Sequence, residues 1–148
     1  MPDKLFVDTN IWVYAHLQDE KDPRCEIAWD FVNRISRPVI SPQVIAEYYN
    51  VMLRNKQEDK WIQGNIEDML MHCEIQPMGR TVILKAIEIR NRFGFSYWDC
   101  QIVAAALEAG CTQLYTEDMQ DGQIINGQVK LINPLRLNAT SASELGKK

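Results

Sequence analysis

The sequence predicts an α/β fold in which helices cover both faces of a central, mostly parallel sheet. Short apolar runs, typical of buried strands, alternate along the chain with longer segments whose apolar residues recur every three or four positions. Strands and helices in alternation form parallel sheets through right-handed crossovers. The length of 148 residues fits a single domain of this kind.

The expected strands are short apolar runs bounded by polar or turn-forming residues. The first ends at the polar turn Asp8-Thr9-Asn10, and the last precedes Pro134. The five expected strands span residues 5–7, 38–40, 74–76, 113–116 and 129–132.

The expected helices lie between these strands and carry their own start and stop signals. Ser41 and Pro42 are typical of an N-cap and a first helical position, and Gly94 and Gly110 are typical of helix ends. The expected helices begin after Asn10 and at Ser41 and span 24–35, 58–72, 81–93 and 96–109. We expect one domain over residues 1–137, followed by a polar, flexible tail over 138–148.

The composition is that of a folded protein with a modest negative charge. Hydrophobic residues make up 46% of the chain, and the formal net charge is -4. This charge argues against broad electrostatic coating of nucleic acid but leaves room for a local basic track. The four cysteines form no close pair, which favours buried free thiols in a reducing compartment. Without a signal peptide or membrane span, we expect a cytoplasmic protein.

Four acidic residues interrupt the apolar pattern. Asp8 directly follows the strand 5–7, and Asp118 lies two residues beyond the strand 113–116, so both should stand where open parallel sheets bind ligands. Glu47 and Asp99 lie early in helices, on the same faces as residues expected in the core. Because these helices follow strands, we expect all four carboxylates to converge at the carboxyl edge of the sheet.

A cluster of carboxylates in a partly dry site needs a compensating cation, because like charges raise one another's proton affinity. Mg²⁺ or Mn²⁺ is the expected partner, since hard divalent ions take carboxylate oxygens and no Cys or His cluster favours a softer metal. Such a site can lower the pKa of bound water and hold phosphate oxygens, which is the chemistry of phosphodiester hydrolysis.

Each acid taken alone also has a structural interpretation. Asp99 could complete a capping box with Ser96, and Asp8 could cap the first helix. Glu47 could be a partly exposed helix residue, and Asp118 could be a turn residue. The joint pattern favours the shared site.

The motifs that carry these acids resemble the PIN domain family, and within it the VapC-like toxins of bacterial and archaeal toxin–antitoxin pairs. The resemblance runs from Phe6 to about Ile132. The motifs are Val7-Asp8-Thr9-Asn10, the stretch Ser-Pro-Gln-Val-Ile-Ala-Glu-Tyr-Tyr-Asn that holds Glu47, Tyr97-Trp98-Asp99, and Tyr115-Thr116-Glu117-Asp118-Met119.

The resemblance implies a three-layer α/β/α PIN-like fold and an endoribonuclease that binds one or two Mg²⁺ or Mn²⁺ ions. Asp8 and Asp99 are then similar to the main metal ligands of the family. Glu47 is similar to a ligand or water-positioning acid, and Asp118 to the fourth acid, which holds a second metal or its water shell.

Weaker candidates stand beside these four. Asn10 and Thr116 match polar residues that the family often has near its acids, and Asp121 could be a fifth acid. Glu117 directly precedes Asp118, so the motif leaves open which of the two faces the metal.

The resemblance also implies partners: an RNA substrate, a small antitoxin with a basic residue that enters the acidic pocket, and a second copy in a homodimer. A PIN nuclease of RNA processing or DNA metabolism without an antitoxin is the alternative. A phosphoacceptor signalling domain is disfavoured, because Thr9 and Asn10 follow Asp8 where that class has acids, and no Lys follows Thr116. A binding module without catalysis is disfavoured because all four acids are present.

Two further groups have both a functional and a structural interpretation. Tyr97 and Trp98 could stack an RNA base, although we expect core packing for at least one of them. A basic group could contact phosphate, but a solvated helix face is favoured. The basic residues are Arg80, Lys85, Arg90 and Arg92.

Overall fold

The computed structural model describes residues 3–136, and the tail expected over 138–148 lies outside these residues. The strands are β1 (Leu5–Val7), β2 (Val39–Ile40), β3 (Glu74–Ile75), β4 (Gln113–Tyr115), β5 (Ile124–Ile125) and β6 (Val129–Ile132). The helices are α1 (Thr9–Leu17), α2 (Pro23–Arg34), α3 (Pro42–Arg54), α4 (Asp59–His72), α5 (Arg80–Phe93) and α6 (Tyr97–Glu108).

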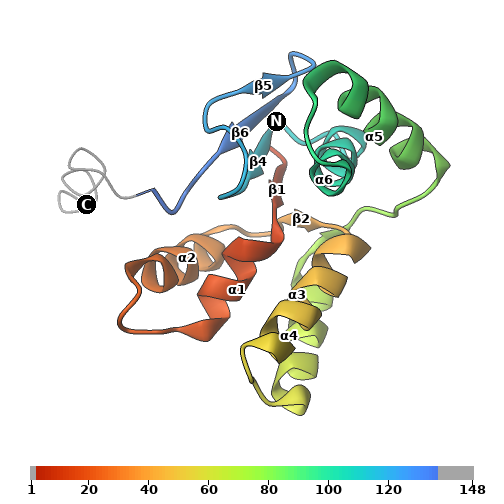
Figure 1. Cartoon of the computed structure of the whole chain (residues 1–148). Coiled ribbons are helices and arrows are strands. Elements are labelled where there is room, and N and C mark those ends of the chain that lie inside the picture. Colours follow the sequence, from red (N-terminus) through yellow and green to blue (C-terminus); the bar gives the residue numbers. More distant parts are fainter. Residues whose placement is uncertain (1–2, 137–148) are drawn as a thin grey trace.

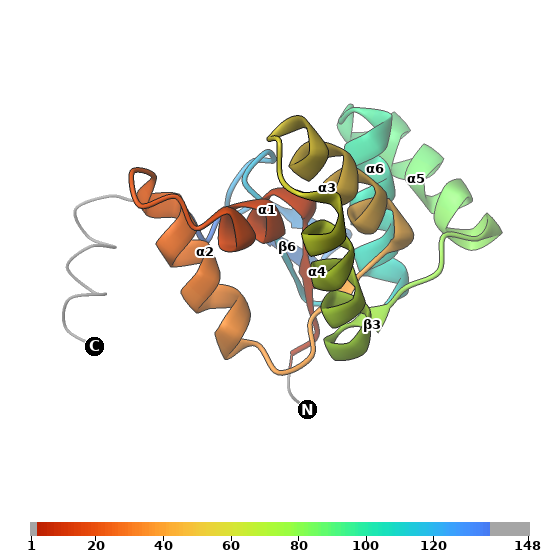
Figure 2. The ribbon, with the colours of Figure 1, turned by 90° about the horizontal axis from the view of Figure 1, so that it is seen from below.

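The described strands form one sheet in the order β3-β2-β1-β4-β6-β5. The first five strands of this order run parallel, and β5 pairs antiparallel with β6. Helices α1 and α2 pack together on one side of the sheet and α5 and α6 on the other, whereas α3 and α4 extend beside α1 as an antiparallel pair (Figures 1 and 2). The expected α/β fold with a mostly parallel central sheet is confirmed.

Local capping explains where several helices begin. The carboxylates of Asp8 and Asp22 accept hydrogen bonds at the starts of α1 and α2, and the Ser96 hydroxyl accepts from the backbone of Asp99 at the start of α6. Ser41 is the N-cap residue of α3, as the sequence suggests, but its buried hydroxyl makes no capping bond. Pro42 at the first helical position still favours the start of α3.

Strand β5 is absent from the sequence prediction. Asn126 and Gly127 both have positive φ, 52° and 64°, and the amide of Gln128 donates to the carbonyl of Ile125 at 3.0 Å. These features define a two-residue hairpin turn between β5 and β6. The Asn-Gly pair was therefore the signal for this hairpin, but only two apolar residues precede it, which is too short a run for the strand pattern to register.

The core is continuous across the sheet, but one helix presents a different face from the one its pattern suggests. Helix α5 buries Val82, Ala86 and Ile89, while Leu84 is 61% exposed. A helix over 81–93 is predicted by the spacing of four apolar residues: Ile83, Leu84, Ile87 and Phe93. The first three of these lie largely on the solvent side of the helix.

The four cysteines are buried and unpaired, as expected. Within residues 3–136, no helix combines the length and the apolar character needed to cross a bilayer.

Candidate metal centre

Buried polarity in the described chain is concentrated at one edge of the sheet. Among residues 3–136, the polar and charged residues that are buried are Asp8, Thr9, Ser41 and Thr116. Asp8 and Thr9 directly follow β1, Ser41 directly follows β2, and Thr116 directly follows β4. These three strands are neighbours and run parallel, so their carboxyl ends meet at the same edge. This is where open parallel sheets bind ligands.

Asp8 lies at the centre of this edge and is 6% exposed. Its Oδ1 accepts from the backbone amide of Thr9 at 2.7 Å, and its Oδ2 accepts from the hydroxyl of Thr116 at 2.9 Å. Burial raises the pKa of Asp8 to about 7, although the two hydrogen bonds oppose this shift. The negative charges of Glu47 and Asp118 raise the pKa further. Asp8 is thus a carboxylate whose ionised form lacks a compensating charge.

Glu47, on α3, is held toward the same edge by two donors. The Thr9 hydroxyl donates to Oε2 at 3.1 Å, and Nε2 of Gln43 donates to Oε1 at 2.6 Å. The same Gln43 nitrogen donates to the carbonyl of Trp98 at 3.1 Å, which ties α3 to the start of α6. Thr9 and Gln43 are site residues that the sequence motifs did not indicate. The one available signal was that Gln43 and Glu47 are four residues apart on a helix.

Asp118 and Asp99 complete the group. The side-chain amide of Asn10 donates to Oδ2 of Asp118 at 2.9 Å, and the amide of Asp118 donates to the Thr116 hydroxyl at 3.3 Å. Asp118 lies at the exposed rim. Partial burial, followed by the charge of Asp99, raises the pKa of Asp118. This contribution of Asp99 means that the two carboxylates lie close enough to repel each other.

Asp99 is half-buried at the third position of α6. Its backbone amide donates to the Ser96 hydroxyl at 3.2 Å, which is one half of a capping box. The reciprocal bond, in which the backbone amide of Ser96 would donate to the Asp99 carboxylate, is not formed, and within residues 3–136 this carboxylate has no hydrogen-bond partner. Its oxygens are therefore available to a ligand.

Two neighbouring acids point elsewhere. Glu117 accepts from the Tyr14 hydroxyl at 3.0 Å and from Nη1 of Arg24 at 3.1 Å, which directs it toward α1 and α2. Burial, reinforced by the bond to Glu117, raises the pKa of Tyr14 to about 12, so its hydroxyl remains a donor. Asp121 accepts from the backbone amide of Asn133 at 2.9 Å and pairs with Arg136 at 3.3 Å.

The donor set fits a hard divalent cation. None of the ion pairs within residues 3–136 involves Asp8, Glu47, Asp99 or Asp118, so no protein cation compensates these acids. As the side chains stand, no group of three or more His, Cys, Asp or Glu in the described chain is arranged to hold a metal ion. Like charges raise one another's proton affinity, so a bound divalent cation would stabilise the ionised form of these acids. Two buried side-chain oxygens beside this edge, Ser41 Oγ and Gln43 Oε1, also have no hydrogen-bond partner among the described residues.

Other features of the surface lie away from these acids. A cavity of about 420 Å³ opens among α1, α2 and α4, lined in part by Trp12, His16 and Trp29. Arg90 bonds the carbonyls of Gly94 and Phe95 beyond the end of α5. Arg92 bonds the side chain of Asn126 in the β5–β6 turn. These two arginines therefore have structural partners, in line with the favoured structural interpretation.

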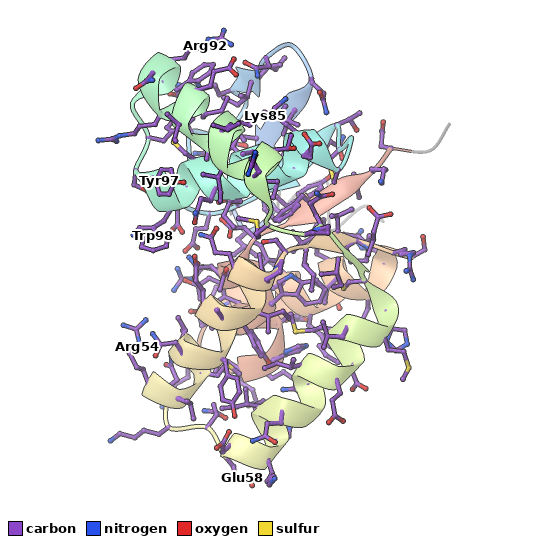
Figure 3. The ribbon with its side chains drawn as sticks, turned by 90° about the vertical axis from the view of Figure 1, so that its right-hand side faces the viewer. Arg54, Glu58, Lys85, Arg92, Tyr97 and Trp98 are labelled. Atoms are coloured by element: carbon purple, nitrogen blue, oxygen red, sulfur yellow. The ribbon has the colours of Figure 1, made fainter. Side chains whose placement is uncertain are left out.

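Tyr97 and Trp98 differ in their surroundings. Tyr97 packs against the core, whereas Trp98 is 67% exposed. Figure 3 shows both side chains at the start of α6, on the same side of the molecule as Arg54 and Arg92.

The fold is similar to that of several solved toxin–antitoxin proteins. VapC20 of Mycobacterium tuberculosis, described as a toxin that cleaves the sarcin-ricin loop, matches with a TM-score of 0.65 and 18% identity, over 78% of this chain and 90% of that chain. A toxin–antitoxin complex from Klebsiella pneumoniae matches with a TM-score of 0.66 and 17% identity, over 88% of this chain and 97% of that chain. VapBC2 from Rickettsia felis, bound to a promoter DNA fragment, matches with a TM-score of 0.65 and 19% identity, over 87% of this chain and 98% of that chain.

At these identities the likeness is one of fold. None of the curated proteins matches the chain in sequence. The family model of the PIN domain matches residues 5–120, which is most of the chain. The chain therefore belongs to the PIN domain family.

Proposed function

We propose that this chain, through a nuclease domain over residues 1–137, is a divalent-metal-dependent endoribonuclease and the toxin of a type II toxin–antitoxin pair. The observation that carries the proposal is the gathering of buried polar residues and uncompensated acids at one edge of the sheet. Membership of the PIN domain family and the toxin–antitoxin origin of the fold relatives support it.

Four residues are proposed as metal ligands: Asp8, Glu47, Asp99 and Asp118. Bound Mg²⁺ or Mn²⁺ would supply an acidified water and would neutralise charge on the scissile phosphate. Thr9 and Gln43 orient the Glu47 carboxylate through their hydrogen bonds. Asn10 orients Asp118 in the same way. These residues fix the direction of each carboxylate before substrate arrives.

Thr116 links two of the proposed ligands. Its hydroxyl donates to Asp8 and accepts from the amide of Asp118, so one side chain sets the relative position of both acids. Deprotonation of Asp8, whose pKa is about 7 without metal, is part of metal binding, because the ligand must be in its carboxylate form.

RNA is the proposed substrate. The exposed indole of Trp98 directly precedes Asp99 and offers a flat apolar surface to a base beside the acids. The overall charge of -4 argues against broad electrostatic attraction to RNA and favours a substrate held through the bound metal and a limited basic rim.

The proposed partners are a small antitoxin and a second copy of the chain. The acidic edge is complementary to a basic antitoxin side chain, which would satisfy the same carboxylates as the metal. The homodimer is supported by the exposed apolar face of α5, because apolar surface left in water favours association. The alternative, a PIN nuclease without an antitoxin, has the same chemistry and lacks only the first partner.

The test uses the full chain with a single-stranded RNA and a structured RNA. We expect cleavage with Mg²⁺ or Mn²⁺, none with excess chelator, and recovery when metal is restored. Cleavage that persists in chelator would contradict metal dependence. The proposal also predicts a small neighbouring reading frame that encodes the antitoxin: induced expression of this chain should arrest growth, and co-expression of that frame should relieve the arrest. If the chain cleaves RNA but no neighbouring reading frame relieves the growth arrest, a PIN nuclease without an antitoxin is favoured.

A further inference from the structure

Glu117 is built into a network that reaches away from the acids. The Tyr14 hydroxyl on α1 donates to its Oε1 at 3.0 Å, and Nη1 of Arg24 on α2 donates to its Oε2 at 3.1 Å. Both carboxylate oxygens are therefore engaged, by two different helices. Glu117 is only 22% exposed, so these bonds are partly shielded from water.

Arg24 is itself fixed by other partners. Its Nε and Nη2 donate to the Asp22 carboxylate at 3.0 and 2.8 Å, in a two-pronged arrangement. Its guanidinium carbon lies 4.4 Å from the centre of the Tyr14 ring, in cation–π contact. Asp22 is in turn the N-cap of α2 and accepts from the backbone amide of Arg24. The donors are thus held in place independently of Glu117.

The residue that this network holds stands next to a proposed metal ligand. Asp118 follows Glu117 and lies at the exposed rim of the site, where its own side chain is bonded to Asn10. Because the two residues are adjacent, the bonds that hold Glu117 to Tyr14 and Arg24 also fix the backbone from which the Asp118 side chain extends toward Asn10.

We propose that Glu117 is a positioning residue for the metal site, anchored by Tyr14 and Arg24 so that Asp118 faces Asp8 and Asp99. We call these anchoring contacts the Glu117 clamp: Tyr14, Asp22, Arg24 and Glu117. This inference rests on the proposed function, because it concerns the metal site proposed there. It also gives the adjacent acids Glu117 and Asp118 distinct roles, one structural and one toward the ion.

A competing explanation is that the clamp only fastens α1 and α2 to the segment after β4. In that case its loss would lower stability and leave metal affinity unchanged. Half-exposed ion pairs contribute little to stability, so both explanations allow only a small loss of stability. They differ in the metal affinity that they predict for the variants. Stability and metal affinity must therefore be measured on the same variants.

The experiment titrates Mn²⁺ into the full chain, with free Mn²⁺ followed by electron paramagnetic resonance and binding heat by calorimetry. We expect Glu117→Ala to raise the Kd for Mn²⁺ roughly tenfold, the loss typical of a residue that supports a ligand from outside. The Tm should fall by no more than about 4 °C. Glu117→Gln is a milder second variant that keeps an acceptor for Tyr14 and should weaken binding less.

The matched control is Glu74→Ala. Glu74 also forms an ion pair, with Lys4 at 2.8 Å, but it lies at the start of the edge strand β3, which pairs with β2, whereas the acids lie at the carboxyl edge of the sheet. This variant should keep the Mn²⁺ affinity of the parent. Arg24→Met should weaken binding, and adding it to Glu117→Ala should change the Kd by less than about twofold, because Arg24 acts through Glu117.

The outcomes separate this inference from the proposed function. If the parent binds Mn²⁺ and Glu117→Ala and Glu117→Gln bind it equally well, the clamp is only a structural fastening and the inference is wrong. If the parent itself binds no Mn²⁺, the metal site is wrong and both proposals are overturned. Weaker binding in the Glu117 variants, with Glu74→Ala unchanged, supports the inference.

Discussion

The hydroxyl of Thr116 donates a hydrogen bond to Oδ2 of Asp8 at 2.9 Å and thereby joins the ends of two neighbouring strands, β4 and β1. The Thr116 hydroxyl oxygen also accepts a hydrogen bond from the backbone amide of Asp118 at 3.3 Å. Thr116 is 1% exposed, so these bonds are shielded from water. One buried hydroxyl thus connects a central acid with a rim acid.

Replacing Thr116 by Val should therefore impair metal binding while leaving the fold intact. Val has nearly the shape of Thr but cannot donate to Asp8 or accept from Asp118. We expect metal affinity or RNA cleavage to fall by roughly 10- to 100-fold. Thr116→Ser, which restores the hydroxyl, should recover most of this loss. Equal activity of the Val and Ser variants would show that the hydroxyl has no such role.

The raised pKa of Asp8 predicts how metal affinity depends on pH. Asp8 has a pKa of about 7 in the folded protein and an ordinary value of 3.8, so between these pH values the folded state keeps a proton that the unfolded chain releases. Without metal, Asp8 should therefore lower the free energy of unfolding as pH rises from about 4 to 7, whereas buried His16, whose pKa is lowered to about 4, raises it over much of the same interval.

Metal binding must displace the same proton. The Mn²⁺ association constant should rise about tenfold per pH unit below 7 and level off above it. The stability of the parent minus that of Asp8→Asn, measured by denaturant unfolding at several pH values, should fall as pH rises from about 4 to 7, because the His16 contribution is common to both proteins. A difference that stays constant over this interval would show that Asp8 is ionised in the folded state throughout.

Trp98 should contribute to substrate binding more than to the chemical step. Stacking of one base on an aromatic side chain contributes about 1–3 kcal/mol, so Trp98→Ala should raise KM roughly tenfold with little change in kcat. Trp98→Phe should keep most of the affinity. Trp61, which is 40% exposed on α4, provides the control, because Trp61→Ala should leave KM unchanged. A fall in kcat with constant KM would assign Trp98 to another role.

The parts of the structure that sequence predicted best are those with strong local signals. Strand β1, which Asp8 directly follows, and the helix that begins after Ser96 have clear apolar patterns and polar caps. Both lie where expected. The position of Asp8 at the carboxyl edge followed from these signals together with the rule for parallel sheets.

Other features depend on tertiary contacts that a local pattern does not contain. The partner of Glu117 on α2 is 93 residues distant in sequence, and that of Thr9 on α3 is 38 residues distant. The buried face of α5 is also set by its packing against α6, because Leu84 is as apolar as the residues that α5 buries.

The central claim is that the four acids form a metal site that cleaves RNA, and Asp99 tests it most directly. Its carboxylate has no hydrogen-bond partner in the described part of the chain, so Asp99→Asn should disturb the fold least. The matched control is Glu108→Gln at the exposed end of the same helix.

The measurement is Mn²⁺ binding and RNA cleavage by the parent, Asp99→Asn and Glu108→Gln at equal thermal stability. We predict that Asp99→Asn lowers both the Mn²⁺ affinity and the cleavage rate by more than roughly 100-fold, the largest loss typical of a residue that only supports a metal ligand. Glu108→Gln should match the parent in both quantities. Parental Mn²⁺ affinity and cleavage rate in Asp99→Asn would contradict the account.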